Sequence, residues 1–184
     1  MSTVRLSWIS AAANVVGYQL VWTACVAGAG RGMAWLGPFA AVAFVTATLA
    51  FGGKRDADLR ALGLATLLGV AMDSLFAASG WLNYAQAWPW PMLAPFWIWA
   101  LWAAFAMTLN HSLSFLQDRP WIAAMLGLVC GPLAYWAAAG TFNAVEFGVP
   151  LPWIMSALGL GWALLLPLLM IVNKRLAPAP GALA

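Results

Sequence analysis

The amino-acid sequence predicts an all-α membrane protein, a bundle of six transmembrane helices with both termini in the cytoplasm. Hydrophobic residues make up 65% of the chain and charged residues only 7%, whereas a soluble domain is about half apolar and roughly a quarter charged. Apolar runs of about 20 residues, each able to cross a hydrocarbon core of roughly 30 Å, fill most of the chain. Residues 1–176 are therefore expected to form one transmembrane domain, with no separate soluble domain.

The six predicted helices follow the apolar runs and are separated by polar or proline-rich segments. They are expected at about residues 7–28, 33–51, 61–80, 95–116, 121–140 and 153–172. The charged cluster at residues 54–60 is predicted to lie in water between the second and third helices. Two segments rich in aromatic residues and proline, residues 81–95 and 146–152, are predicted to be interfacial loops. The Pro/Ala/Gly tail, residues 177–184, is expected to be disordered.

The first apolar run has an alternative interpretation as a cleaved signal peptide. Arg5 precedes an apolar stretch that ends in small residues, which is the order found in secretory signals. The run is longer than a typical signal core, and it carries Asn14, Tyr18 and Gln19 in its middle. These features favour a packed transmembrane helix.

Basic residues in short loops predict the orientation of the bundle, because such residues accumulate on the cytoplasmic side. With the N-terminus inside, only Arg31 lies outside, and the other seven of the eight basic residues are cytoplasmic. The same orientation gathers tryptophans at the outer interface: Trp35, Trp81, Trp88, Trp90 and Trp153. The expected location is the bacterial inner membrane. Because the basic residues are scattered singly, the net charge of +3 does not indicate a nucleic-acid partner.

Asp73 is the most informative residue, since a carboxylate inside a transmembrane run costs at least a few kcal/mol and faces a partner or a cavity. Thr66, Gly69, Ala77 and Gly80 share its helix face and would let a neighbouring helix approach closely. One interpretation is a proton-linked or ligand-binding acid. The other is a hydrogen-bonded aspartate that fastens helices together.

Counting depth at 1.5 Å per residue predicts a polar cavity open to the outer side. Gln19, Asp73 and Tyr135 are expected in one layer, about 18–21 Å from the cytoplasmic helix ends. Asn14 and His111 are expected in a second layer at about 8–11 Å, and Glu146 at the cavity mouth. The predicted ligand-binding residues are Asp73, Gln19, Asn14, Tyr135, His111 and Glu146. The amides and the histidine could instead be structural hydrogen-bonding groups, and Glu146 could simply be solvated.

No cofactor, metal or catalytic residue is predicted. One histidine, few acids and two cysteines cannot easily supply a metal shell or a pair of haem ligands. Cys25 and Cys130 are expected to differ in depth by more than about 10 Å, beyond disulfide reach, and to be free. The chain also lacks a phosphate-binding glycine loop and the HExxH and GxSxG motifs.

Several segments distributed along the chain resemble one known family. They are residues 14–22, 73–74, 97–105, 108–113, 131–136 and 144–147. They resemble a proteobacterial inner-membrane family of unknown function, and the resemblance spans nearly the whole chain. It implies a fold and a compartment without an activity. Members of that family are often encoded beside proteins like cyclopropane-fatty-acid synthases and flavin-dependent proteins implicated in membrane-lipid modification. The resemblance therefore implies membrane lipids and lipid-modifying enzymes as partners.

Four functions remain open at this stage. The first is an accessory or lipid-binding protein in membrane-lipid modification, with a cavity near Asp73, Gln19 and Tyr135. The second is a small proton-linked transporter that uses Asp73. The third is a membrane enzyme that uses Asp73, Glu146 or His111 as acid or base. The fourth is a structural or assembly factor, which a fully hydrogen-bonded Asp73 in a sealed core would favour.

Overall fold

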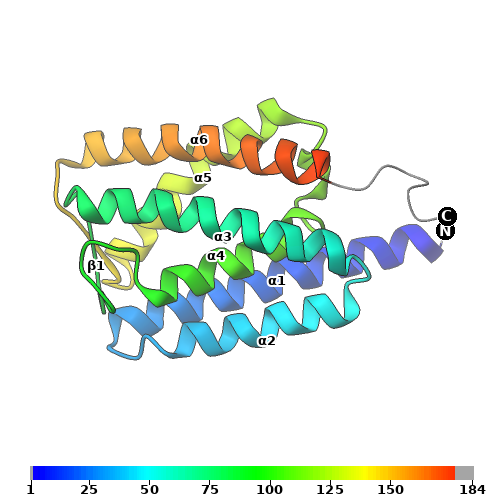
Figure 1. The fold of residues 1–184 in the computed structure, drawn as a ribbon, viewed down its shortest axis with the longest axis horizontal. Coiled ribbons are helices and arrows are strands. Elements are labelled where there is room, and N and C mark those ends of the chain that lie inside the picture. The colour runs from blue at the N-terminus through cyan, green and yellow to red at the C-terminus, as the bar shows by residue number, and fades with distance from the viewer. Residues whose placement is uncertain (1, 177–184) are drawn as a thin grey trace.

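The computed structural model describes residues 2–176, with side chains from residue 9 onward. The helices of this region are α1 (Ser2–Gly30), α2 (Leu36–Phe51), α3 (Arg55–Ala78), α4 (Phe96–Leu109), the short 3-10 helix η1 (Ser114–Leu116), α5 (Pro120–Gly140) and α6 (Leu151–Arg175). Each α-helix runs opposite to the one before it, so α1 begins and α6 ends at the same end of the bundle (Figure 1). The predicted tail, residues 177–184, lies outside the described residues.

Four of these helices, α1, α3, α5 and α6, are long and apolar enough to cross a membrane. The other two, α2 and α4, are apolar but shorter, about 24 Å and 21 Å at 1.5 Å per residue. Large apolar side chains point outward, as Leu67, Leu75 and Leu164 do at 69%, 72% and 74% exposure. An exterior of this kind suits hydrocarbon and not water. The helices therefore support an integral membrane protein.

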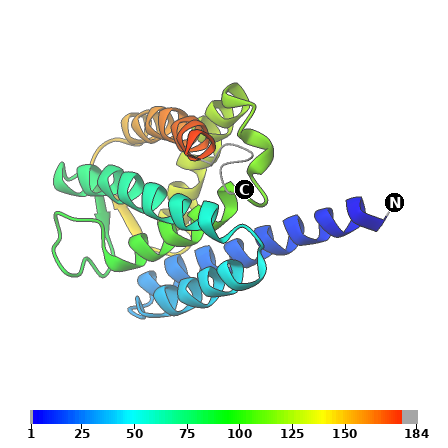
Figure 2. The ribbon, with the colours of Figure 1, turned by 45° about the vertical axis from the view of Figure 1, so that its right-hand side comes forward.

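The six helices stack as three packed pairs, α1 with α2, α3 with α4, and α5 with α6 (Figure 2). Within the bundle, α4 also packs on α1 and α2, and α3 packs on α6. Glycines permit the closest approaches. A Cβ atom at Gly69 of α3 would overlap the Trp102 ring of α4, and one at Gly127 of α5 would overlap the backbone of Trp162 on α6. Because α5 packs mainly on α6, it stands away from α1 and α4.

Two helix boundaries differ most from the predicted ones. Helix α3 begins at Arg55 and not at residue 61, so most of the charged cluster predicted to lie in water is helical, and Asp58 is fully buried. Asp58 is tolerated there because neighbouring side chains hydrogen-bond it and because the N-terminal turn of a helix favours negative charge. Helix α4 ends at Leu109 and not at residue 116, since the Gln117 Nε2 atom donates to the Leu109 carbonyl at 3.1 Å and closes that end.

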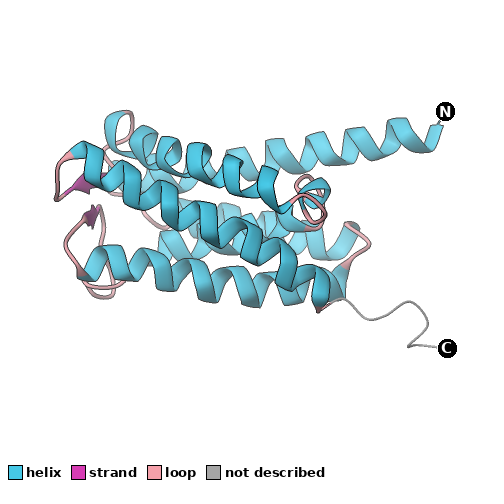
Figure 3. Cartoon of the chain, turned by 90° about the horizontal axis from the view of Figure 1, so that it is seen from above, coloured by secondary structure: helices cyan, strands magenta, loops and turns pink. Residues whose placement is uncertain are grey.

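A small sheet lies in the two segments predicted to be interfacial loops. Strand β1 (Leu82–Tyr84) pairs antiparallel with β2 (Val145–Phe147), and Asn83 lies opposite Glu146. Figure 3 shows both strands at the end of the bundle opposite the start of α1. The sheet joins the α3–α4 connection to the α5–α6 connection, which places Tyr84 over the end of α3.

Candidate functional site

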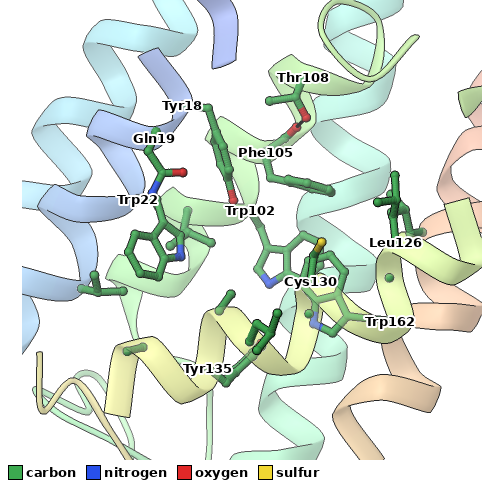
Figure 4. Close-up of a pocket in the computed structure, with 18 of the residues that line it drawn as sticks. Tyr18, Gln19, Trp22, Trp102, Phe105, Thr108, Leu126, Cys130, Tyr135 and Trp162 are labelled. Atoms are coloured by element: carbon green, nitrogen blue, oxygen red, sulfur yellow. Dashed lines mark hydrogen bonds between the residues drawn. The ribbon is translucent and has the colours of Figure 1, made fainter. Parts of the chain in front are cut away.

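A cavity of about 630 Å³ lies where α5 stands away from α1 and α4 (Figure 4). Its volume is within the range of about 300–1,000 Å³ that is common for small-molecule sites. Tyr18 and Trp22 reach it from α1, Tyr135 from α5, and Trp102 and Phe105 from α4. Most of the other lining side chains are aliphatic, and none carries a basic group. The site is therefore an apolar and aromatic chamber.

The mouth of this cavity is at the side of the bundle. Four lining residues are exposed: Val15 and Gln19 on α1, and Cys130 and Leu133 on α5. Gln19 lies about 17 Å before the end of α1 and Cys130 about 15 Å before the end of α5, at 1.5 Å per residue. These distances are about half of the roughly 30 Å that a transmembrane helix covers. The cavity thus opens between two helices at mid-height.

Asp73 forms part of the inner wall and is 0% exposed. Its Oδ1 atom accepts hydrogen bonds from the hydroxyls of Tyr84, at 2.6 Å, and Tyr135. Its Oδ2 atom accepts one from the Trp102 indole N–H at 2.5 Å. Burial, and then the neighbouring carboxylate, raise the pKa of Tyr84 well above its usual value, so this hydroxyl stays protonated and can donate. Asp73 therefore fastens α3 to β1, α4 and α5.

The local sequence explains how an aspartate fits against a tryptophan at this position. Gly69 lies one helical turn before Asp73 and on the same face of α3. The missing side chain at Gly69 leaves room for the Trp102 ring, which is 1% exposed and stacks on Trp162 with centroids 4.9 Å apart. The ring is thereby held where its N–H reaches the carboxylate.

A second buried polar cluster surrounds Asp58 at the opposite end of α3. The Asn110 Nδ2 atom donates to Asp58 Oδ1 at 3.0 Å, and the His111 Nε2 atom lies 2.9 Å from Oδ2. The Asn110 Oδ1 atom in turn accepts from Asn173 at 2.7 Å and from Gln117 at 3.2 Å. This cluster joins the start of α3 to the ends of α4 and α6, and it does not line the cavity.

In comparison with known proteins, a family model described as a protein of unknown function, DUF2878, matches residues 11–168. The chain belongs to the DUF2878 family. No curated protein and no solved structure matches it. The DUF2878 region contains every residue that lines the cavity and also both buried aspartates, Asp58 and Asp73. Both polar clusters and the cavity are therefore located in the family's shared region, apart from Asn173.

The structure separates the six predicted ligand-binding residues into two groups. Gln19, Asp73 and Tyr135 line the cavity. The other three do not line it. Asn14 donates to the Met107 carbonyl at 3.1 Å and accepts from Ser112 at 2.7 Å. His111 pairs with Asp58, and Glu146 is exposed on β2.

Within the first group the depth assignments also change. Because α3 begins early, Asp73 lies about 27 Å from the start of α3 and only about 8 Å from its end. Asp73 is therefore closer than Gln19 to the end of the bundle that carries the sheet, and it is buried whereas Gln19 is exposed.

Several side chains of the two clusters were not anticipated. Tyr84 was placed in a predicted interfacial loop, Asp58 was placed in water, and Trp102 was given no part in the predicted site. The sequence did contain a clue to the Asp73 partners, because buried tyrosine and tryptophan usually place their O–H or N–H against an acceptor, and an intramembrane acid needs donors.

Among the described residues there is no group of three or more His, Cys, Asp or Glu side chains that could hold a metal. Cys25 is buried and Cys130 exposed, and both are free.

The Asp58 cluster leads to a stability prediction. Changing Asp58 to Ala leaves the buried Asn110 donor and the half-buried His111 without their partner, which should lower the free energy of unfolding by about 1–3 kcal/mol. Asp56→Ala, an exposed acid in the same helical turn, is the matched control and should change it by less than about 0.5 kcal/mol. Unfolding of the purified protein in SDS-containing mixed micelles measures both. Equal losses for the two variants would contradict a structural role of Asp58.

Proposed function

We propose that this DUF2878 protein is a bacterial inner-membrane protein that holds the apolar chain of a membrane lipid in the cavity between α1, α4 and α5. In this proposal it acts as an accessory or lipid-binding protein for enzymes that modify membrane lipids. The observation that carries the proposal is the mid-height mouth formed by Val15, Gln19, Cys130 and Leu133. A mouth at this depth opens to acyl chains and not to water.

The lining of the cavity supports a hydrocarbon occupant. Most of the lining side chains are aliphatic or aromatic, and such walls contact a hydrocarbon chain favourably. Asp73 is the acid in the lining, and its two oxygens already accept three hydrogen bonds. A lipid chain could enter sideways without leaving hydrocarbon. The chain would gain contact with Trp22, Phe105 and Trp162.

The distribution of charge supports the proposed orientation, with all six helices in the membrane and both termini in the cytoplasm. Lys54 precedes α3, Arg119 precedes α5, and Lys174 lies in the last turn of α6, so the three lie at the same end of the bundle. Arg31 follows α1 at the opposite end. Basic residues mark the cytoplasmic side of short loops.

Blocking the mouth tests lipid binding. Cys130→Trp should obstruct the opening and lower photo-crosslinking of a diazirine-tagged stearoyl phospholipid by about fivefold or more, in the purified protein in lipid nanodiscs. Val129→Trp is the matched control, because Val129 is 52% exposed on the same helix and does not line the cavity. It should crosslink as the unchanged protein does, with the label on peptides of α1, α4 and α5. Equal crosslinking in both variants, or label outside these helices, would contradict lipid binding in the cavity.

The accessory role is tested in cells that lack the chromosomal gene. Restoring the unchanged protein should restore the lipid composition, and restoring Cys130→Trp should not. An unchanged lipidome in the deletion strain would contradict the accessory role. It would favour the structural or assembly alternative, which the three hydrogen bonds to Asp73 support.

A further inference from the structure

The polar side chains that line the cavity divide into two sets. One set is engaged by the protein itself: Trp97 donates to the Ala85 carbonyl at 2.9 Å, Thr108 to the Phe105 carbonyl at 2.6 Å, Ser112 to Asn14 at 2.7 Å, and Trp102 and Tyr135 to Asp73. The other set makes no side-chain hydrogen bond within the described part of the chain. Its members are Tyr18, Gln19, Trp22 and Trp162.

All four members of this second set offer a donor. The Trp162 N–H is buried, and its geometry makes no hydrogen bond to any of the described residues. The indole groups of Trp22 and Trp162 can only donate. Figure 4 shows Tyr18, Gln19 and Trp22 on one side of the chamber and Trp162 on the other. An unpaired donor in hydrocarbon is costly, so the set calls for an acceptor.

The charge of the lining limits what that acceptor can be. No lysine, arginine or histidine lines the cavity, and the Asp73 carboxylate is close by. An anionic head such as a phosphate or carboxylate would lack a counter-charge and would be strongly disfavoured in hydrocarbon. A neutral oxygen has no such penalty.

The depth of the donors further limits the identity of the acceptor. Tyr18 lies about 18 Å from the end of α1 and Trp162 about 17 Å from the start of α6, at 1.5 Å per residue. These depths are near the middle of a hydrocarbon core of roughly 30 Å, whereas the ester carbonyls of phospholipids lie at its boundary. The acceptor must therefore belong to a molecule whose oxygen lies within the hydrocarbon itself.

We infer that the cavity selects a lipid carrying a neutral, hydrogen-bond-accepting oxygen at mid-membrane depth. Two sources supply this chemistry: an acyl chain with an oxygen function along its length, and a quinone head group on an apolar tail. The inference rests on the proposed function and adds the chemical class of the ligand. In it, the Tyr18 and Trp162 donors recognise the oxygen, and the aromatic walls hold the remainder.

The test uses competition against the crosslinking lipid in the full-length protein, with three probes. Octadecane and octadecan-9-one differ only in one carbonyl group, and decylubiquinone represents the quinone source. The ketone or the quinone should compete about fivefold or more better than octadecane. Stronger competition by the ketone would indicate that the ligand is an oxygenated acyl chain, and stronger competition by decylubiquinone would indicate a quinone head group.

Removing a single donor should erase part of this preference. Trp162→Phe keeps a ring against Trp102 and should weaken the preferred probe by about 2- to 12-fold, without changing competition by octadecane. Tyr18→Phe should act in the same way and serves as the second variant if the first unfolds. Trp136→Phe is the control, at 56% exposure and outside the cavity.

The possible failures are distinct. If octadecane competes as well as both oxygen-bearing probes, or if neither donor variant changes their affinity, the inference is overturned while lipid binding stands. If crosslinking does not depend on the cavity at all, the proposed function fails first.

Discussion

Asp73→Ala should lower the free energy of unfolding by about 3–5 kcal/mol, because it leaves three buried donors without an acceptor. Tyr84, Trp102 and Tyr135 come from β1, α4 and α5, so the change loosens three elements from α3 together. Reversible unfolding of the purified protein in mixed micelles measures the loss. The same variant should also reduce lipid crosslinking, since Trp102 and Tyr135 line the cavity.

Graded variants separate the carboxylate from its neighbours. Asp73→Asn keeps one acceptor oxygen and should cost about 1–3 kcal/mol, because its amide N–H₂ faces a donor. A double-mutant cycle of Asp73→Ala with Tyr135→Phe should show coupling of about 1 kcal/mol or more. Additive losses in this cycle, or a loss below about 1 kcal/mol for Asp73→Ala, would show that the carboxylate does not hold the elements together.

Gly69→Ala is expected to have the second-largest effect, a loss of about 3 kcal/mol. The added Cβ would overlap the Trp102 ring. The Trp102 ring cannot move easily, because it stacks on Trp162 and its N–H donates to Asp73. It also packs edge-on against Phe105, with ring centroids 5.5 Å apart. The helices α3 and α4 must then separate, and the hydrogen bond to Asp73 is lost or lengthened.

The control for this change lies on the same helix. Gly63 has open space where a Cβ would be placed, so Gly63→Ala should raise stability by about 0.5–1 kcal/mol through better helix propensity. Thermal unfolding of the two variants, side by side in one detergent, gives the comparison. If Gly69→Ala proves as stable as Gly63→Ala, the close packing of Trp102 on α3 is not a requirement of the fold.

Much of the fold was predictable, because apolar length alone marks where helices can cross hydrocarbon. The fifth helix was expected at residues 121–140 and spans Pro120–Gly140. The predicted boundaries were least accurate at the start of α3 and the end of α4, where hydrogen bonds to distant side chains decide whether a polar segment is helical. Hydropathy placed residues 54–60 in water, since it measures the cost of burying Asp58 and not the hydrogen bonds from Asn110 and His111 that offset it.

For the candidate site, the sequence by itself determined that Asp73 needs partners, because an acid in a transmembrane run is too costly to leave unpaired. It could not determine which groups satisfy it. The three donors lie 11, 29 and 62 residues away along the chain, on elements whose contacts depend on packing. Only the tertiary structure decided that Gln19 lies at the mouth of a cavity, Asp73 at its inner wall and His111 in a separate cluster. The physical reason is that helix spacing, set by glycines and large rings, determines where a cavity remains, and no single segment encodes that spacing.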